Sequence, residues 1–143
     1  MNTLAWLLLA LALLKPLAVT AHGEDKPGPN GGFIRMPGAF HTEVVAQKPN
    51  QLKVFLLDIA WKNPVVAKSS VKATHESSAK QKSDVSCSPE KNFFVCKFPK
   101  SVDVSKAGTL TLFATRDSQA GIPAAYPLPL KLDKPTDDHS GHH

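Results

Sequence analysis

Two consecutive β-strands are predicted by residues 40–61, which read FHTEVVAQKPNQLKVFLLDIAW. Over residues 40–46, a period of two places Phe40, Thr42, Val44 and Ala46 on one face and His41, Glu43 and Val45 on the other, as in a half-buried strand. A Lys-Pro-Asn turn at residues 48–50 then separates this segment from residues 52–61. The latter are apolar on nearly both faces, so they predict a central strand. The pair indicates a β-rich domain.

Five further segments on the C-terminal side share this period of two, at residues 70–76, 84–87, 93–98, 109–115 and 126–132. The last segment contains prolines, which lack an N–H donor, so we expect it at a sheet edge. About seven short strands with no amphipathic helix predict an all-β fold, an immunoglobulin-like β-sandwich over residues 34–132.

The segments that flank this domain are polar. Residues 22–33 are rich in proline and glycine and predict a flexible arm. Residues 133–143 are polar and histidine-rich and predict a disordered tail. Neither segment carries the apolar side chains that a core needs.

The N-terminus has the layout of a secretory signal. Residues 4–14 form an apolar run, shorter than the roughly 20 residues that span a bilayer. Small residues follow at Val19 and Ala21, which predicts a signal peptide over residues 1–21 with cleavage after Ala21. No lipobox cysteine follows, so we expect a secreted, periplasmic protein without stable membrane insertion.

The two cysteines, Cys87 and Cys96, support this localisation. An even number in an oxidising compartment predicts a disulfide, here across a hairpin. So short a loop stabilises by roughly 2–3 kcal/mol. The alternative is a metal-binding or redox pair of thiols, but zinc thiolate pairs are typically separated by only about two to four residues.

Composition and motifs argue against nucleic-acid binding and catalysis. The chain has 17 Lys and Arg against 12 Asp and Glu, but the basic residues are scattered and only Arg35 and Arg116 are arginines. There is no Gly-x-Ser-x-Gly elbow, no His-Glu-x-x-His helix and no phosphate-binding glycine loop. The sequence therefore predicts that the protein is not an enzyme.

The six histidines are unevenly placed. His139, His142 and His143 lie within the last five residues, after two aspartates. Such a tract supplies imidazoles for Cu(II), Ni(II) or Zn(II), although a merely solvated tail is the alternative. Only His41 and His75 lie inside the predicted domain, and His75, on a weak strand, is expected at the surface or its boundary.

His22 becomes the first residue if cleavage follows Ala21. Its α-amine and imidazole would then chelate one Cu(II) ion, and Glu24 would add an oxygen. The alternative is that a histidine stands at this position by chance.

His41 and Glu43 are two residues apart on a predicted strand, so their side chains leave the same face. This spacing suits one metal ion, and Met36 upstream offers a thioether to Cu(I). The alternative is an ordinary polar outer face. Asp58, in the most apolar strand, is expected to anchor backbone or lysine partners or to mark the strand end.

A resemblance adds to these observations. Gly-Pro-Asn-Gly-Gly at residues 28–32, followed by residues 40–45 and 52–58, resembles a pattern that begins Gly-Pro-His-Gly-Gly. The pattern is that of small periplasmic heavy-metal-handling proteins and of the N-terminal segment of periplasmic adaptor subunits of resistance–nodulation–division metal-efflux systems. The similarity covers residues 27–64, with a looser match near residues 108–112. It implies a β-sandwich that handles copper, zinc, cobalt or nickel, but Asn30 replaces the histidine of the pattern.

The leading hypothesis is a periplasmic metal-binding protein for copper, with zinc or nickel as the other candidate ions. It would buffer the ion or deliver it to an efflux or assembly partner. One alternative is a non-catalytic immunoglobulin-like interaction module of an envelope complex, in which the histidines are incidental. Another is a small copper oxidase, which requires an ordered two-histidine site at the N-terminus.

Overall fold

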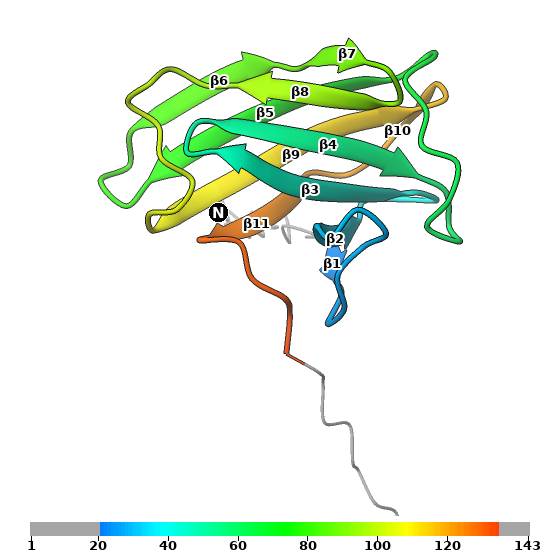
Figure 1. Ribbon diagram of the computed structural model, residues 1–143, viewed down its shortest axis with the longest axis horizontal. Coiled ribbons are helices and arrows are strands. Elements are labelled where there is room, and N and C mark those ends of the chain that lie inside the picture. The colour runs from blue at the N-terminus through cyan, green and yellow to red at the C-terminus, as the bar shows by residue number, and fades with distance from the viewer. Residues whose placement is uncertain (1–20, 135–143) are drawn as a thin grey trace, which may run out of the picture.

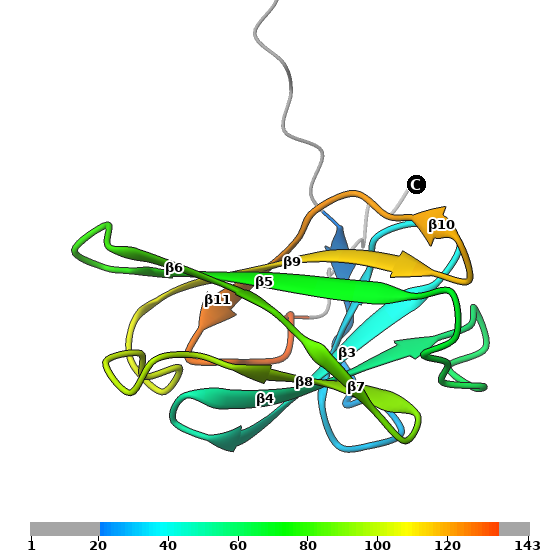
Figure 2. The ribbon, with the colours of Figure 1, turned by 90° about the horizontal axis from the view of Figure 1, so that it is seen from above.

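A computed structural model describes residues 21–134, which form a sandwich of two antiparallel β-sheets (Figure 1). The first sheet has six strands, in the order β1 (His22–Gly23), β2 (Phe33–Met36), β3 (His41–Lys48), β4 (Gln51–Leu57), β8 (Phe93–Lys97) and β7 (Ser88–Glu90). The second contains β10 (Gln119–Ala120), β9 (Gly108–Arg116), β5 (Ser70–Ser77) and β6 (Lys82–Ser86), and β11 (Ala124–Leu128) also pairs with β9. Figure 2 shows the sheets as two layers.

All seven predicted strands are present, as β3, β4, β5, β6, β8, β9 and β11. Four more, β1, β2, β7 and β10, are only two to four residues long, too short for periodicity to reveal them. β4 lies between β3 and β8, which confirms its predicted central place. Within the described residues β11 pairs only with β9, in keeping with its prolines.

The main core lies between the two layers. Leu52, Val54 and Leu56 of β4 are fully buried, as are Leu110 and Leu112 of β9. These residues sit at alternate positions of their strands, so the period-two pattern does mark the inward face.

A second apolar cluster covers part of the outer face of the six-stranded sheet. It consists of Ile34, Phe55, Leu57, Phe93 and Val95, with Val45 and Trp61 packed against it. This outer cluster is the reason that β4 is apolar on both faces. Polar side chains on the same face, including His41 and Glu43, are therefore buried beside it.

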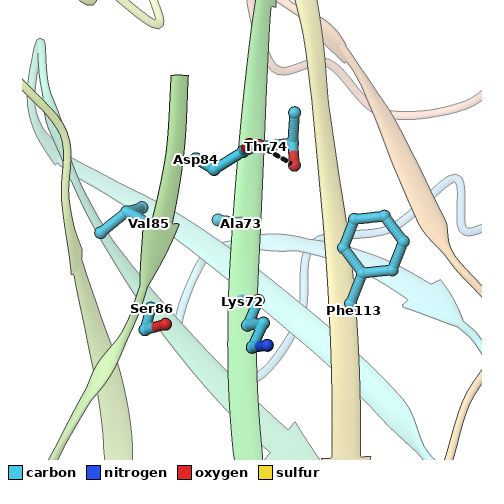
Figure 3. Close-up of a pocket in the computed structure, with 7 residues that line it drawn as sticks. All are labelled: Lys72, Ala73, Thr74, Asp84, Val85, Ser86 and Phe113. Atoms are coloured by element: carbon cyan, nitrogen blue, oxygen red, sulfur yellow. Dashed lines mark hydrogen bonds between the residues drawn. The ribbon is translucent and has the colours of Figure 1, made fainter. Parts of the chain in front are cut away.

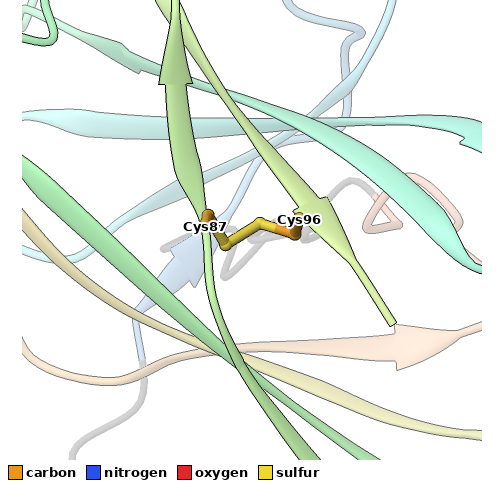
Figure 4. The surroundings of a disulfide bond; sticks show 2 residues. All are labelled: Cys87 and Cys96. Carbon is orange, nitrogen blue, oxygen red and sulfur yellow. A yellow bond between two sulfur atoms is a disulfide. The ribbon is translucent and has the colours of Figure 1, made fainter. Parts of the chain in front are cut away.

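The predicted disulfide is confirmed (Figure 4). Cys87 and Cys96 have Cα atoms 4.3 Å apart. Cys87 lies where the chain passes from β6 in one sheet to β7 in the other. The hairpin that the bond closes is β7–β8, while β6 pairs with β5, so the bond helps to fix the crossing between the sheets.

The segment predicted to be a flexible arm contributes one short strand, β1, to the six-stranded sheet. β1 pairs with β2, below β3 in Figure 1, and Ala21 packs in the main core. Residues 1–20, which make up all but the last residue of the predicted signal peptide, and the histidines of the predicted tail, His139, His142 and His143, lie outside the described residues. Between residues 21 and 134 there is no helix long and apolar enough to cross a membrane.

Candidate metal site

Glu43 is fully buried on β3, and its carboxylate is occupied by the loop that precedes β2. The backbone N–H groups of Asn30 and Gly32 donate to Oε1, at 2.8 and 2.9 Å. The side-chain amide of Asn30 donates to Oε2 at 2.8 Å. These three donors already satisfy most of the acceptor sites of this buried carboxylate, so its predicted role as a metal ligand gains no support from the geometry.

The glycine-rich motif at residues 28–32 is shaped around that carboxylate. The N–H of Gly28 donates to the carbonyl of Gly32, and that of Gly31 to the carbonyl of Gly28, both at 2.9 Å. A Cβ on Gly28 would lie 2.5 Å from the carboxyl group of Glu43, and Gly31 has a φ of +74°. Here the motif has a structural role, and Asn30, at the position of the pattern's histidine, serves as a hydrogen-bond donor.

His41 is 4% exposed and has one defined partner. Its Nδ1 lies 3.1 Å from the carbonyl oxygen of Asp58. Because a carbonyl oxygen can only accept, we assign the proton to Nδ1, which leaves the lone pair of the neutral ring on Nε2. Trp61 packs edge-on against the ring, with centroids 5.9 Å apart.

The turn after β4 holds this arrangement. The Oδ1 atom of Asp58 accepts the backbone N–H groups of Ala60 and Lys62, at 2.9 and 2.8 Å. Its Oδ2 accepts the side-chain amide of Asn63 at 2.8 Å, and the N–H of Lys62 does most to lower the pKa of Asp58. As predicted, Asp58 marks the strand end and anchors backbone. Within this turn Trp61 adopts a left-handed φ of +62°.

The strand register brings two separate histidines toward one methionine. His22 of β1 pairs with Met36 of β2. β2 and β3 pair Arg35 with Thr42, and one step further along this antiparallel register places Met36 beside His41. His22, Met36 and His41 thus form one row across three neighbouring strands, which we call the outer row.

The neighbours of the outer row show which way it faces. Ala21 packs in the main core. The Arg35 guanidinium stacks over the ring of Tyr126, 5.0 Å from its centroid. The hydroxyl of Thr42 lies 2.7 Å from that of Tyr126, in the interior. Because successive residues of a strand alternate, the outer row points to the opposite, outer face of the sheet.

Accessibility increases along the row. His41 is buried, Met36 is 38% exposed and His22, at the sheet edge, is exposed. Neighbouring strands lie about 4.8 Å apart, so the two histidines flank the methionine at similar distances. The His22 end of the row is exposed to solvent, whereas the His41 end packs against Trp61 and the outer cluster.

The other predicted ligands do not join the row. Glu24 is half-buried beyond the paired part of β1. His75 lies on β5, in the second sheet, packed edge-on against Phe98 with ring centroids 6.1 Å apart. Its pKa is lowered by burial, against a weaker opposing effect of Asp103. His139, His142 and His143 fall outside the described residues.

Within residues 21–134, no three His, Cys, Asp or Glu side chains gather closely enough to hold a metal ion. The outer row supplies two imidazoles, and its third donor is a thioether. The register of β1, β2 and β3 makes Met36 as strong a ligand candidate as the two histidines. The sequence carries no signal for that register.

A shallow hollow lies on the outer face of the second sheet (Figure 3). Lys72, Thr74, Asp84 and Phe113 line it, and the Thr74 hydroxyl donates to Asp84 at 2.6 Å. Thr74 thus occupies the Asp84 carboxylate and no histidine lines the hollow, so the outer row is the better candidate for metal binding.

Comparison with known proteins gave no match: no family model, no curated protein and no solved structure is significantly similar to this chain. The case for function therefore rests on the geometry above.

Proposed function

We propose that this protein binds copper at the outer row in the periplasm and buffers the ion or delivers it to an efflux or assembly partner. The contact between Nδ1 of His41 and the carbonyl of Asp58 is the observation that carries the proposal. Histidines that bind metals commonly donate their second ring N–H to a carbonyl or carboxylate, which fixes the tautomer and the ring orientation.

The donor types favour copper over the other ions considered. Imidazole suits copper, zinc and nickel alike, whereas a thioether such as that of Met36 selects Cu(I). Two imidazoles and one thioether supply three neutral donors. The partly exposed Met36 leaves the site open to an exchanging partner.

Cleavage after Ala21 would add a further donor, the α-amine of His22. This amine and the His22 imidazole would suit Cu(II), so the open edge of the row would serve the oxidised ion as well. Cleavage would also remove Ala21 from the core, a loss of one small side chain.

The test is a competition titration of mature, tag-free protein against a Cu(I) chelator without oxygen, with parallel titrations of Cu(II) and Zn(II). We expect one Cu(I) ion per chain. Met36→Leu and His41→Gln should each weaken Cu(I) binding at least tenfold. His75→Gln, which changes a buried histidine outside the row, is the matched control and should bind as the parent does.

Unchanged Cu(I) affinity in both Met36→Leu and His41→Gln would overturn the outer row as a site. Circular dichroism of each variant separates a lost ligand from a lost fold. Zn(II) affinity should be far less sensitive to Met36→Leu than Cu(I) affinity, because zinc has little preference for a thioether.

An interaction module remains the second candidate, and one feature favours it. Met36, Ile59 and Ile122 are among the large apolar side chains that the described residues leave exposed. Ile59 lies in the turn beside His41, and the N–H of Ile122 donates to the carbonyl of Pro37, next to Met36. Failure of every metal to bind would leave this apolar end as the functional feature.

A further inference from the structure

The outer face of the second sheet carries three rows of mostly polar side chains across β6, β5 and β9. The strand registers place together Ser86, Lys72 and Phe113, then Asp84, Thr74 and Thr111, then Lys82, Glu76 and Thr109. The residues between them on β5 and β9 are buried, so the alternation of each strand turns the three rows toward solvent. This face lies on the opposite side of the sandwich from the outer row.

The shallow hollow described above is one part of a longer trough on this face. It has a volume of about 380 Å³. A second hollow of about 360 Å³ shares Thr74, Asp84 and Phe113 with it and continues along β5 to Glu76 and Thr109. Each is near the lower limit of the roughly 300–1,000 Å³ of small-molecule sites. We call their combined lining the sheet trough, and its length suits an extended ligand.

Phe113 gives the sheet trough an apolar wall. Its side chain is 46% exposed, and it is the aromatic one among the exposed large apolar side chains of the described residues. Pairing of β9 with β11 ends at Leu112 and pairing with β10 begins at Thr115, so within residues 21–134 no strand lies beside Phe113 there. Figure 3 shows its ring at one side of the hollow, across β5 from Asp84. An open aromatic ring can stack on the apolar C–H face of a sugar ring.

Hydrogen-bonding groups of both kinds accompany the ring. The Thr74 hydroxyl donates to Oδ1 of Asp84 at 2.6 Å, which orients the carboxylate. A carboxylate has about four acceptor sites, so Asp84 can still accept from a ligand hydroxyl or amide N–H. Lys72 and the Ser86 hydroxyl line the same hollow as donors. An aromatic wall with donors and acceptors beside it matches a saccharide, which has an apolar ring face and a polar rim.

The charges of the sheet trough favour an uncharged ligand. Lys72 and Lys82 are balanced by Asp84 and Glu76, whereas the whole chain has a net charge of +5. The Nζ atom of Lys82 lies 3.5 Å from Oε2 of Glu76, which neutralises it directly. Such a face has no excess of positive charge with which to attract a phosphate group or a nucleic acid.

We propose that the sheet trough binds an uncharged, N-acetylated oligosaccharide, with one sugar ring stacked on Phe113. The acetamido group of such a sugar carries an N–H donor and a carbonyl acceptor. The N–H group fits the Asp84 carboxylate, and the carbonyl fits the donors Lys72 and Ser86. This binding activity goes beyond copper binding and uses the other sheet, so it stands or falls separately from the outer row.

The test is a titration of copper-free, mature protein with triacetylchitotriose, the trimer of N-acetylglucosamine, followed through the backbone amide signals in NMR spectra. We expect saturable shifts confined to β5, β6 and β9. Phe113→Ala should weaken binding about tenfold, because it removes the aromatic anchor. Since Phe113 lies outside the core, this variant should keep its fold, which circular dichroism checks. Ile122→Ala shortens an exposed apolar side chain outside the sheet trough and is the matched control, which should bind as the parent does.

Cellotriose, a glucose trimer of the same linkage without acetamido groups, should bind about tenfold more weakly, because the hydrogen bonds of those groups are missing. Equal binding of cellotriose would overturn the assignment to an N-acetylated sugar. Absence of saccharide-induced shifts, or equal binding by Phe113→Ala, would overturn the site itself. Shifts on β5, β6 and β9 that grow with protein concentration and do not respond to saccharide would identify self-association through this face, and would overturn it as well.

Discussion

Glu43 shows how one buried carboxylate can organise a whole loop. Three N–H groups from Asn30 and Gly32 satisfy it, although no cation lies among its hydrogen-bond partners. Hydrogen bonds to a charged acceptor are stronger than neutral ones, so the loop and β3 stabilise each other. Glu43, whose spacing from His41 suggests a metal ligand, therefore has a structural role in holding this loop against β3.

Replacing that carboxylate tests its structural role. Glu43→Gln places an amide N–H₂ group opposite N–H donors, which leaves buried donors unsatisfied. We expect the free energy of unfolding to fall by about 1–3 kcal/mol, measured by urea denaturation. Glu90→Gln, at an exposed position of β7, should change it by less than about 0.5 kcal/mol. Equal stability of the two variants would contradict the role given to Glu43.

A pH dependence follows from His75. Burial lowers its pKa below the ordinary value of 6.5, so below that pH the unfolded chain binds more protons than the folded one. The free energy of unfolding should therefore fall as the pH drops from 6.5 toward 5. Well above pH 6.5, His75 should not contribute to the pH dependence of the unfolding free energy. His75→Gln should show a shallower fall in the same urea experiments. An identical slope in both proteins would remove His75 as the cause.

At the scale of elements, strand length decides what the sequence reveals. Strands such as β9 show several full alternations and are predicted within two residues of their bounds. β1 and β10 have two residues each, and no pattern can be read from so few. Residues 22–33 carry the sequence pattern of a flexible arm, and in the structure they include β1 and a glycine-rich loop that donates hydrogen bonds to Glu43. A strand that buries apolar side chains shows a period of two in the sequence. Hydrogen bonds between a glycine-rich loop and a buried carboxylate produce no such pattern, so the sequence does not predict them.

The β7–β8 hairpin offers an element-level prediction. The Cys87–Cys96 bond holds β7, an edge strand of three residues, where the chain changes sheets. The variant with both Cys87→Ala and Cys96→Ala should lose about 2–3 kcal/mol of unfolding free energy. A reducing agent should destabilise the parent similarly and leave the double variant unaffected. Full stability of the double variant would mean that the strand pairing alone fixes this crossing.

For the whole molecule, the fold class was predictable and the arrangement of the site was not. His22 and His41 stand out in the sequence, but 18 residues lie between them. Their relation depends on β1 pairing with β2 and on β2 pairing with β3. His75, in contrast, lies on β5, which pairs with β9 in the other sheet. Long-range strand pairing, which local sequence does not encode, therefore assembles the candidate site.

That assembly predicts a coupling between copper and global stability. An ion held by His22, Met36 and His41 would tie the short β1 to the two strands beside it. Free Cu(I) at about 100 times its dissociation constant should raise the unfolding free energy by about 2.7 kcal/mol, seen as a higher midpoint of thermal unfolding without oxygen. A Cu(I) chelator should reverse the shift, and amide hydrogen exchange should slow first at β1. The shift should vanish in Met36→Leu and persist in His75→Gln. A shift of equal size in Met36→Leu would place the stabilising ion elsewhere in the chain, because only a site that includes the Met36 thioether couples the ion to these three strands.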